Sequence, residues 1–241
     1  MDAGTNHACA VVGGLVYCWG DNSKGQAGGS AASYTTAQLI PSPTSRAMNV
    51  KEIELGANAS CGVAEGTGYC WGDAYTTGGA SSVPVAVSGG ALPADSTVSD
   101  IALGLTSGCL TADGRPYCWG QLEGQLGNGT TDASAVPVLV DTAGEMGRLD
   151  LGDLSVGGEF ACATAADHPG VDAWRDQTFC WGDDSRAQLG RGWIDPPRLP
   201  ALIPVRVMGP LVERNIVNLD LRGSTACAID VDGETFCWGT T

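Results

Sequence analysis

A short cysteine-flanked unit recurs five times and constrains the fold of this chain more than any other feature. Its first copy is CAVVGGLVYCWG, from Cys9 to Gly20. Every cysteine of the 241-residue chain belongs to one of the copies, and each copy ends in Cys-Trp-Gly. A motif repeated at roughly 50-residue spacing predicts a repeat architecture. The tryptophans of these endings are Trp19, Trp71, Trp119, Trp181 and Trp238, at steps of 52, 48, 62 and 57 residues.

The symmetry of each unit predicts a β-hairpin whose two cysteines face each other. Cys9 and Cys18 are equidistant from Gly13-Gly14, which reads as a two-residue turn. In that register the cysteines form a non-hydrogen-bonded pair, with Cα atoms about 4.5 Å apart, which a disulfide accepts. We therefore predict five disulfides within hairpins: Cys9–Cys18, Cys61–Cys70, Cys109–Cys118, Cys162–Cys180 and Cys227–Cys237.

Metal binding is the rival interpretation of the cysteines. Eight residues separate the cysteines of the shorter units, which is not zinc-ribbon spacing, and only His7 and His168 could add imidazole ligands. We therefore expect no metal and no cofactor. Ten cysteines in matched pairs instead imply an oxidising compartment. In the chain-entropy treatment each ten-residue loop stabilises the fold by about 2.7 kcal/mol.

The tryptophan of each hairpin lies on the face opposite the cysteines, because side chains alternate along a strand. Its expected cross-strand partner is always small. A large ring over a small partner favours packing in the core, with a ligand platform as the alternative. The small partners are Ala8, Ser60, Gly108, Ala161 and Ala226.

Composition supports many short strands and argues against some partners. The chain has 36 Gly and 12 Pro, which punctuate strands and turns rather than helices. The formal charge of −15, with only 12 Lys plus Arg, argues against nucleic acid. No run reaches transmembrane length. The opening MDAGTNHACA lacks signal-peptide features, so we expect either an introduced Met1 or an excised part of a secreted precursor.

Two further strands separate successive hairpins. A Pro-bearing strand occupies residues 83–87, 136–140 and 203–207, with a degraded copy at 39–43. Proline confines such a strand to an edge or a strand start. A third strand follows, as at residues 50–56. Each repeat is therefore expected to hold four strands.

The succession of PVxV, IxLG, DGxxYCWG and GQLG resembles the regulator of chromosome condensation repeat family, most closely its cysteine-containing bacterial secreted or surface branch. The resemblance covers essentially the whole chain. It implies an all-β fold, a β-propeller with about one four-stranded blade per repeat. The family's HxCA feature is present only at His7–Ala10. The other copies carry Ala59, Ser107, Phe160 and Thr225 at the histidine position.

We expect residues 1–241 to form a single repeat array of about five blades. The resemblance implies a seven-bladed ring closed by strands from both termini, whereas this chain opens just before one hairpin and stops just after another. The array is thus either a five-bladed ring or an open arc of a larger ring, whose free edges could pair with a partner or a second copy. The hairpin units lie near residues 3–29, 55–79, 102–129, 155–192 and 221–241.

The fourth repeat carries an expanded hairpin loop, TAADHPGVDAWRDQT, and an unusual connector, GRGWIDPPRLP. Both tryptophans outside the repeat motif lie here, each near an arginine. Trp and Arg are enriched at interface hot spots, and surface loops often carry binding function. The alternative is a tolerated insertion whose Trp covers apolar surface. The candidate partner-binding residues are His168, Trp174, Arg175, Arg191, Trp193 and Arg198.

No catalytic constellation emerges from the remaining residues. The carboxylates fall mostly in turns, where they are usually solvated or cap amides. Asp230–Glu234 matches only the opening of a calcium-binding loop. Asn58-Ala59-Ser60 and Asn128-Gly129-Thr130 are glycosylation sequons.

Three classes of function follow. The first is a non-catalytic, secreted or cell-surface propeller that binds a protein partner, because repeat arrays offer broad surfaces and no active site is visible. The second is a carbohydrate-binding or hydrolytic propeller with its site in the central channel or the repeat-four loops. Clustered carboxylates facing the channel would favour it. The third, nucleotide exchange on a small GTPase, agrees poorly with the disulfides and the acidity.

Overall fold

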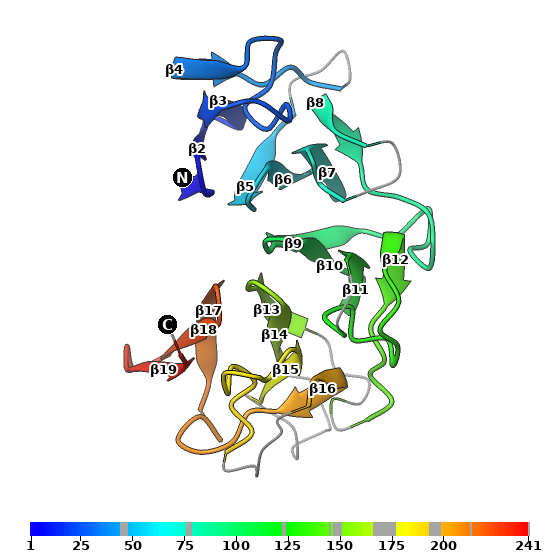
Figure 1. Cartoon of the computed structure of the whole chain (residues 1–241), viewed down its shortest axis with the longest axis vertical. Coiled ribbons are helices and arrows are strands. Elements are labelled where there is room, and N and C mark those ends of the chain that lie inside the picture. Colours follow the sequence, from blue (N-terminus) through cyan, green and yellow to red (C-terminus); the bar gives the residue numbers. More distant parts are fainter. Residues whose placement is uncertain are drawn as a thin grey trace.

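The computed structural model is an all-β propeller of five antiparallel sheets arranged around a common centre (Figure 1). It describes residues 1–43, 48–75, 79–121, 124–144, 146, 151–165, 177–192, 199–212 and 214–240. In these residues there are nineteen strands and no helix. The predicted fold class and blade count of about five are confirmed. None of the described residues forms a helix long and apolar enough to cross a membrane.

Each sheet is one blade, numbered here in chain order. Four blades have four strands and the fifth has three among the described residues. Blade 1 holds β1 (Asp2–Ala3), β2 (His7–Val12), β3 (Leu15–Asp21) and β4 (Ser33–Leu39), and blade 2 holds β5 (Val50–Leu55), β6 (Ala59–Ala64), β7 (Thr67–Gly72) and β8 (Ser81–Ala86). Blade 3 holds β9 (Val98–Leu103), β10 (Ser107–Ala112), β11 (Arg115–Gly120) and β12 (Ser134–Leu139). Blade 4 holds β13 (Leu151–Val156), β14 (Phe160–Ala165), β15 (Thr178–Gly182) and β16 (Ala201–Arg206), and blade 5 holds β17 (Ile216–Arg222), β18 (Thr225–Asp230) and β19 (Thr235–Gly239).

The Pro-bearing strands form the outer edges of blades 2, 3 and 4, as the missing proline N–H requires. The degraded copy differs from expectation. β4 ends in the same register as the other outer strands, with Leu39 opposite Tyr17 as Leu139 is opposite Tyr117. The last bond, from Ile40 N–H to the Val16 carbonyl at 2.9 Å, corresponds to that of Val140 to Pro116. Residues 36–40, and not the expected 39–43, therefore take the place of 136–140, and the outer strand of blade 1 contains no proline.

All five predicted disulfides are confirmed. The paired cysteines lie directly opposite each other in the hairpin register, with Cα atoms 4.0–4.1 Å apart. The described residues contain no free cysteine. The bridges therefore tie together the two middle strands of every blade.

Reduction of all five disulfides is expected to destabilise the protein strongly. By constraining the unfolded chain, each bridge stabilises the folded state by about 2–3 kcal/mol. The hydrophobic core of a single blade is too small to compensate for the loss of its bridge. To measure the effect, one sample is first denatured, reduced and alkylated, and is then returned to native buffer. Its thermal unfolding is compared with that of the untreated protein. An unchanged melting temperature after complete alkylation would contradict the prediction.

Adjacent blades stack through two different faces, which we call the Cys face and the Trp face after the hairpin residues they carry. The Cys face of blade 1 packs against the Trp face of blade 2 in one buried cluster that includes Cys9, Cys18, Ile53, Leu55 and Trp71. Trp71, Trp119 and Trp181 are completely buried, which confirms core packing for them. Each indole also donates to a loop carbonyl of the preceding blade. The bonds are Trp71 to Gln26 (3.0 Å), Trp119 to Ala74 (2.9 Å), Trp181 to Gln125 (3.0 Å) and Trp238 to Gln188 (2.8 Å).

Glycines at the end of the innermost strands set how closely the blades approach. A Cβ on Gly56 would lie 2.6 Å from the carbonyl oxygen of Gly104 in the next blade. A Cβ added to Gly4 would likewise come too close to the Gly56 carbonyl oxygen, and one added to Gly104 too close to the Gly157 carbonyl oxygen. This explains the glycine of the IxLG motif, because real Cβ atoms do not approach backbone so closely.

Blades 5 and 1 meet differently from the other neighbours. In blade 5 the position of Gly4, Gly56 and Gly104 is taken by Arg222, which pairs with Thr225. Its guanidinium donates to the Ala3 carbonyl and the Asp2 carboxylate, both at 3.2 Å. Both termini lie on this side of the arrangement (Figure 1). The array is therefore an arc whose two ends are bridged by a side chain at the inner rim.

Candidate functional site

The innermost strands of all five blades line a central channel rich in carboxylates. β1, β5, β9, β13 and β17 each present alternate side chains to it. One layer consists of residues that pair with the first cysteine of their hairpins: Asp2, Glu54, Ser155 and Asp220. In blade 3 this position is Ala102, which is buried in the core. A second layer, two residues earlier on the strands, consists of Glu52, Asp100, Asp153 and Asn218.

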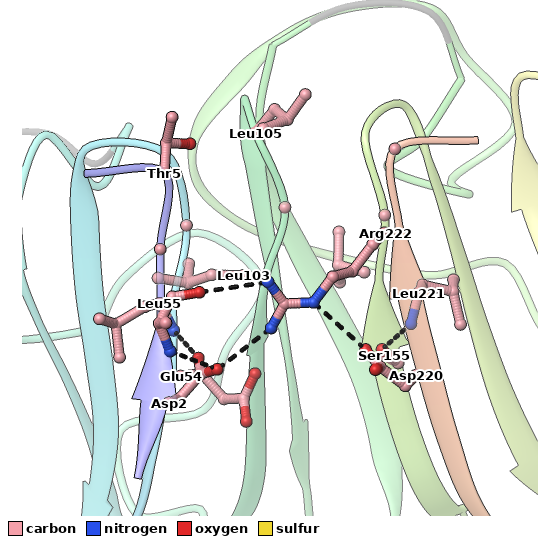
Figure 2. A pocket seen from close by; sticks show the side chains of 17 residues that line it. Asp2, Thr5, Glu54, Leu55, Leu103, Leu105, Ser155, Asp220, Leu221 and Arg222 are labelled. Atoms are coloured by element: carbon pink, nitrogen blue, oxygen red, sulfur yellow. Dashed lines mark hydrogen bonds and ion pairs between the residues drawn. The ribbon is translucent and has the colours of Figure 1, made fainter. Parts of the chain in front are cut away.

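The channel is strongly acidic. Six carboxylates line one opening, accompanied by only two basic side chains, Lys51 and Arg222. Figure 2 shows Arg222 reaching from β17 between Asp2 and Asp220, with Glu54 beside them. The opposite opening is lined mostly by glycines and apolar residues such as Leu105 and Val156, but Asp2, Glu54, Asp220 and Arg222 reach it as well. The two openings thus share these charged side chains and differ in the rest of their lining.

Part of this acidity has a structural purpose. An innermost strand is a sheet edge, and its outward N–H groups need acceptors. Carboxylates of the preceding blade provide them. Asp2 accepts from Leu55 N–H at 2.7 Å, Asp100 from Leu154 N–H at 3.1 Å and Asp153 from Leu219 N–H at 2.5 Å. Asp2, Asp100 and Asp153 therefore join one blade to the next.

The two glutamates of β5 differ from these aspartates. No hydrogen bond of Glu52 or Glu54 is seen among the described residues. Burial, reinforced by Asp2, Glu52, Asp100 and Asp220, raises the pKa of Glu54 to about 8. Burial and the charges of Glu52 and Asp153 raise the pKa of Asp100 to about 7. Burial likewise raises the pKa values of Glu52 and Asp153. The channel therefore holds protons near neutral pH.

This arrangement can attract cations and can hold or release protons. It lacks other features of known site types. No aromatic side chain lines either opening in the described part of the chain. Nor do three His, Cys, Asp or Glu side chains of these residues come together as a metal site would require.

Most of the predicted partner-binding residues cannot be placed. His168, Trp174, Arg175, Trp193 and Arg198 lie outside the described residues. Their role stays a prediction.

Arg191, the remaining candidate, points inward. Its Nε and NH2 atoms donate to the carboxylate of Asp184 at 3.0 and 2.7 Å, and NH2 also donates to the Leu199 carbonyl at 2.6 Å. Asp184 is completely buried. The guanidinium is thus already engaged in neutralising a buried charge.

The weak calcium candidate at Asp230–Glu234 is a hairpin loop held by its own bonds. One Asp230 carboxylate oxygen accepts from the N–H groups of Asp232 and Glu234 at 3.0 and 2.9 Å. The other binds Arg214 at 2.9 Å, and Arg214 also binds Glu234 at 2.6 Å. Arg214 occupies the place that a cation ligand would take.

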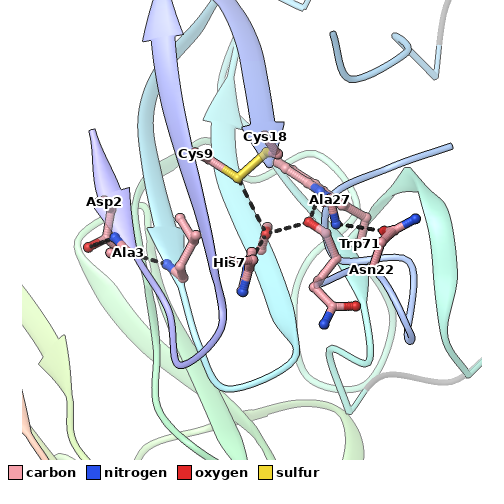
Figure 3. The surroundings of a disulfide bond; sticks show 11 residues. Asp2, Ala3, His7, Cys9, Cys18, Asn22, Ala27 and Trp71 are labelled. Carbon is pink, nitrogen blue, oxygen red and sulfur yellow. Dashed lines mark hydrogen bonds between the residues drawn. A yellow bond between two sulfur atoms is a disulfide. The ribbon is translucent and has the colours of Figure 1, made fainter. Parts of the chain in front are cut away.

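The single histidine of the HxCA feature joins blades 1 and 2. His7 is buried, and its Nε2 lies 2.9 Å from the Ser60 hydroxyl, which donates to the Gln26 carbonyl at 2.9 Å (Figure 3). Burial lowers the pKa of His7, so the ring is neutral at pH 7. Ser60 is completely buried as well.

The channel carboxylates were not singled out from the sequence. A signal was present, because an acidic residue recurs at the third position of the innermost strand in VKEIEL, VSDIAL and LGDLSV. The register of the hairpin cysteines would have placed these acidic residues on the Cys face of each sheet. Their meeting at one channel could not be read from the sequence, because they lie on strands about 50 residues apart.

Comparison with known proteins gives two kinds of similarity. No protein-family model matches the chain. The human E3 ubiquitin-protein ligase HERC2 is 33% identical over 116 residues, which is 48% of this chain and 2% of HERC2. Yeast RCC1 (Prp20) bound to Kap60 has a TM-score of 0.79 at 18% identity, covering 98% of this chain and 54% of that one. Human WBSCR16 has a TM-score of 0.74 at 20% identity, covering 92% and 55% respectively. This chain thus spans about half the length of these solved chains.

Proposed function

The chain belongs to the regulator of chromosome condensation repeat family, and from this premise we propose that it is a non-catalytic propeller scaffold, secreted or held at a cell surface, that binds a protein partner. A fold alone does not specify function, so the support comes from the surface of the blades. Five disulfides accord with an oxidising compartment. Prp20, which has the same fold, is described with binding properties toward Gsp1p and histones.

The acidic opening of the channel is the observation that carries the proposal. It combines side chains from all five blades on a disulfide-bridged framework, within a chain of net charge −15. Such a field accelerates encounter with a basic partner and disfavours acidic ones. The partner we propose is therefore a protein that presents lysine or arginine side chains to this opening.

Neutralising the channel should weaken binding to a basic probe. The variant E52Q/E54Q/D100N keeps side-chain shape and the acceptor oxygen at position 100, and at a pH of about 9, above the pKa values of Glu54 and Asp100, it removes up to three charges. We expect a Lys/Arg-rich peptide to bind it at least about tenfold more weakly than wild type, because rim charges govern such encounters. D132N, which removes an exposed charge on a distant loop, is the matched control. Titration calorimetry at two salt concentrations measures the effect, and equal affinity of wild type and triple variant would contradict the proposal.

A carbohydrate-binding or hydrolytic propeller is the second candidate. The clustered channel carboxylates are the feature that the sequence analysis expects of this class, and the raised pKa values of Glu54 and Asp100 favour it as well. A carboxyl group that keeps its proton near pH 7 can serve as a general acid. Against this, aromatic stacking surfaces are missing from the described channel lining. Hydrolysis of a panel of aryl glycosides that disappears in E54Q and D100N would favour the enzyme over the scaffold.

The same pKa values predict how stability depends on pH. Glu54 and Asp100 titrate near pH 8 and 7 in the folded chain, against ordinary values of 4.5 and 3.8. The folded state therefore holds protons that the unfolded state has released, and stability falls as the pH rises from about 4.5 to 8. We expect E54Q to raise stability at pH 8 by about 2 kcal/mol and to flatten this dependence, with little gain at pH 4.5.

Thermal unfolding across this pH range tests the prediction. E65Q, at an exposed turn position of the same blade, should leave the wild-type profile unchanged. A melting temperature that rises steadily from pH 4.5 to 8 would show that the channel carboxylates are not held in their protonated form.

A further inference from the structure

The two glycosylation sequons of the chain lie in very different surroundings. Asn58-Ala59-Ser60 leads into β6, a middle strand of blade 2, whereas Asn128-Gly129-Thr130 lies in the loop between β11 and β12 of blade 3. Both asparagines are half-buried. The second and third residues of the first sequon are buried, but those of the second sequon are exposed. The sequons therefore differ in how well an enzyme can reach them.

The hydroxyl of the first sequon is already engaged between blades. Ser60 Oγ donates to the Gln26 carbonyl at 2.9 Å and lies 2.9 Å from Nε2 of His7. The Asn58 carbonyl accepts from Asp73 N–H at 2.8 Å. β6 pairs with a strand on each side, β5 and β7. This sequon can be reached only after β6 leaves its sheet.

The second sequon has its side chains arranged for reaction. Asn128 Oδ1 accepts from the N–H and the hydroxyl of Thr130, at 3.2 and 3.0 Å. These bonds form an Asx turn, which places the hydroxyl beside the side-chain amide. No hydrogen bond of Asn128 Nδ2 is seen in the described part of the chain. The bond from Gly129 N–H to the Leu202 carbonyl, at 2.8 Å, fixes the turn on blade 4.

There is room for a sugar beside this turn. Asn128 lines an open hollow together with Arg115, Asp141 and Thr142. The loop leads into β12, the outermost strand of blade 3, at the opposite edge of the sheet from the channel strand β9 (Figure 1). Blades 2 and 4 flank blade 3, so the exposure of this loop belongs to the interior of the array and not to either end of it.

We infer that Asn128 is a site of N-glycosylation in the folded chain, and that the fold withholds Asn58 from the same reaction. The donor is a lipid-linked oligosaccharide diphosphate, presented by an oligosaccharyltransferase. A bond forms between Asn128 Nδ2 and the anomeric carbon of the first sugar, and the bond from that carbon to the diphosphate oxygen breaks. The electron pair leaves with the lipid diphosphate, and the amide nitrogen gives one proton to a base of the transferase. The inference goes beyond the proposed function and shares with it only the secreted or cell-surface location.

A transfer assay on the folded protein tests the inference. Unglycosylated protein is incubated with an oligosaccharyltransferase and a lipid-linked oligosaccharide, and glycopeptides are quantified by mass spectrometry. We expect glycan at Asn128 and at least about tenfold less at Asn58, which reacts only from the small population in which blade 2 is open. N128Q should abolish the modification and N58Q should preserve it. Absence of glycan at Asn128, or equal occupancy of the two sites, would overturn the inference.

Two further comparisons separate the role of the fold from that of the local sequence. T130A should lose the modification and T130S should retain it, because serine restores the hydroxyl beside the amide. Free peptides that span each sequon should lose most of the preference for Asn128. A preference in the peptides as large as that in the folded chain would show that the fold does not select the site. The assay contains no partner protein, so its outcome is independent of the binding that the proposed function requires.

Discussion

Replacement of Gly104 by alanine should destabilise the protein by about 3 kcal/mol, although only one methyl group is added. The new Cβ would lie within 3.0 Å of the Gly157 carbonyl oxygen and 2.8 Å from a methyl of Val156. Both belong to blade 4, and the nearest atom is backbone. Relief therefore requires blades 3 and 4 to move apart, which also disturbs the Asp100 bond to Leu154.

Gly223 provides the control for this prediction. It lies just after the innermost strand of blade 5, one residue beyond Arg222, which takes the position of Gly104. A Cβ on Gly223 would meet nothing within 4 Å. Its φ of +56° makes alanine unfavourable by about 1 kcal/mol on conformational grounds alone. Urea unfolding should thus rank wild type above G223A and both above G104A. If G104A were as stable as G223A, the blades would not be held at the distance that the glycine contacts imply.

Replacement of Arg191 by alanine should cost about 3–5 kcal/mol, because it leaves the carboxylate of Asp184 buried without its guanidinium. Asp184 is completely buried and the Arg191 side chain is 22% exposed. This is a much larger effect than the loss of an ordinary surface ion pair.

In blade 1 the position that corresponds to Asp184 is occupied by an uncharged side chain. Asn22 stands where Asp184 stands, and its amide group donates to the carbonyls of Gly28 and Ala31 at 2.8 and 2.6 Å. Its oxygen accepts from Ala27 N–H, as Asp184 accepts from Leu189 N–H. The double variant D184N/R191A should therefore recover about 2 kcal/mol of the loss in R191A.

A double-mutant cycle by urea unfolding measures this coupling. Comparable stability of R191A and D184N/R191A would show that the buried charge is not the source of the loss. The cycle also bears on partner binding. If Arg191 serves only Asp184, the folded double variant should bind a partner as wild type does.

Sequence alone determined the parts of this protein that depend on short-range order. Each hairpin register follows from its turn and its two cysteines, which lie nine or ten residues apart in four of the five units. The disulfides, the Trp face and the approximate number of blades follow from that register. Proline likewise indicated which strands lie at the edge, except in blade 1, where the outer strand β4 contains no proline and lies earlier in the chain than expected.

Only the tertiary structure decided which side chains meet. The six channel carboxylates come from β1, β5, β9, β13 and β17. The raised pKa values of Glu54 and Asp100 exist because burial and neighbouring charges from other blades act together. Arg191 looked like a surface residue until the fold placed Asp184 beneath it. Local pattern sets strands and turns, whereas burial and charge proximity are properties of the assembled blades.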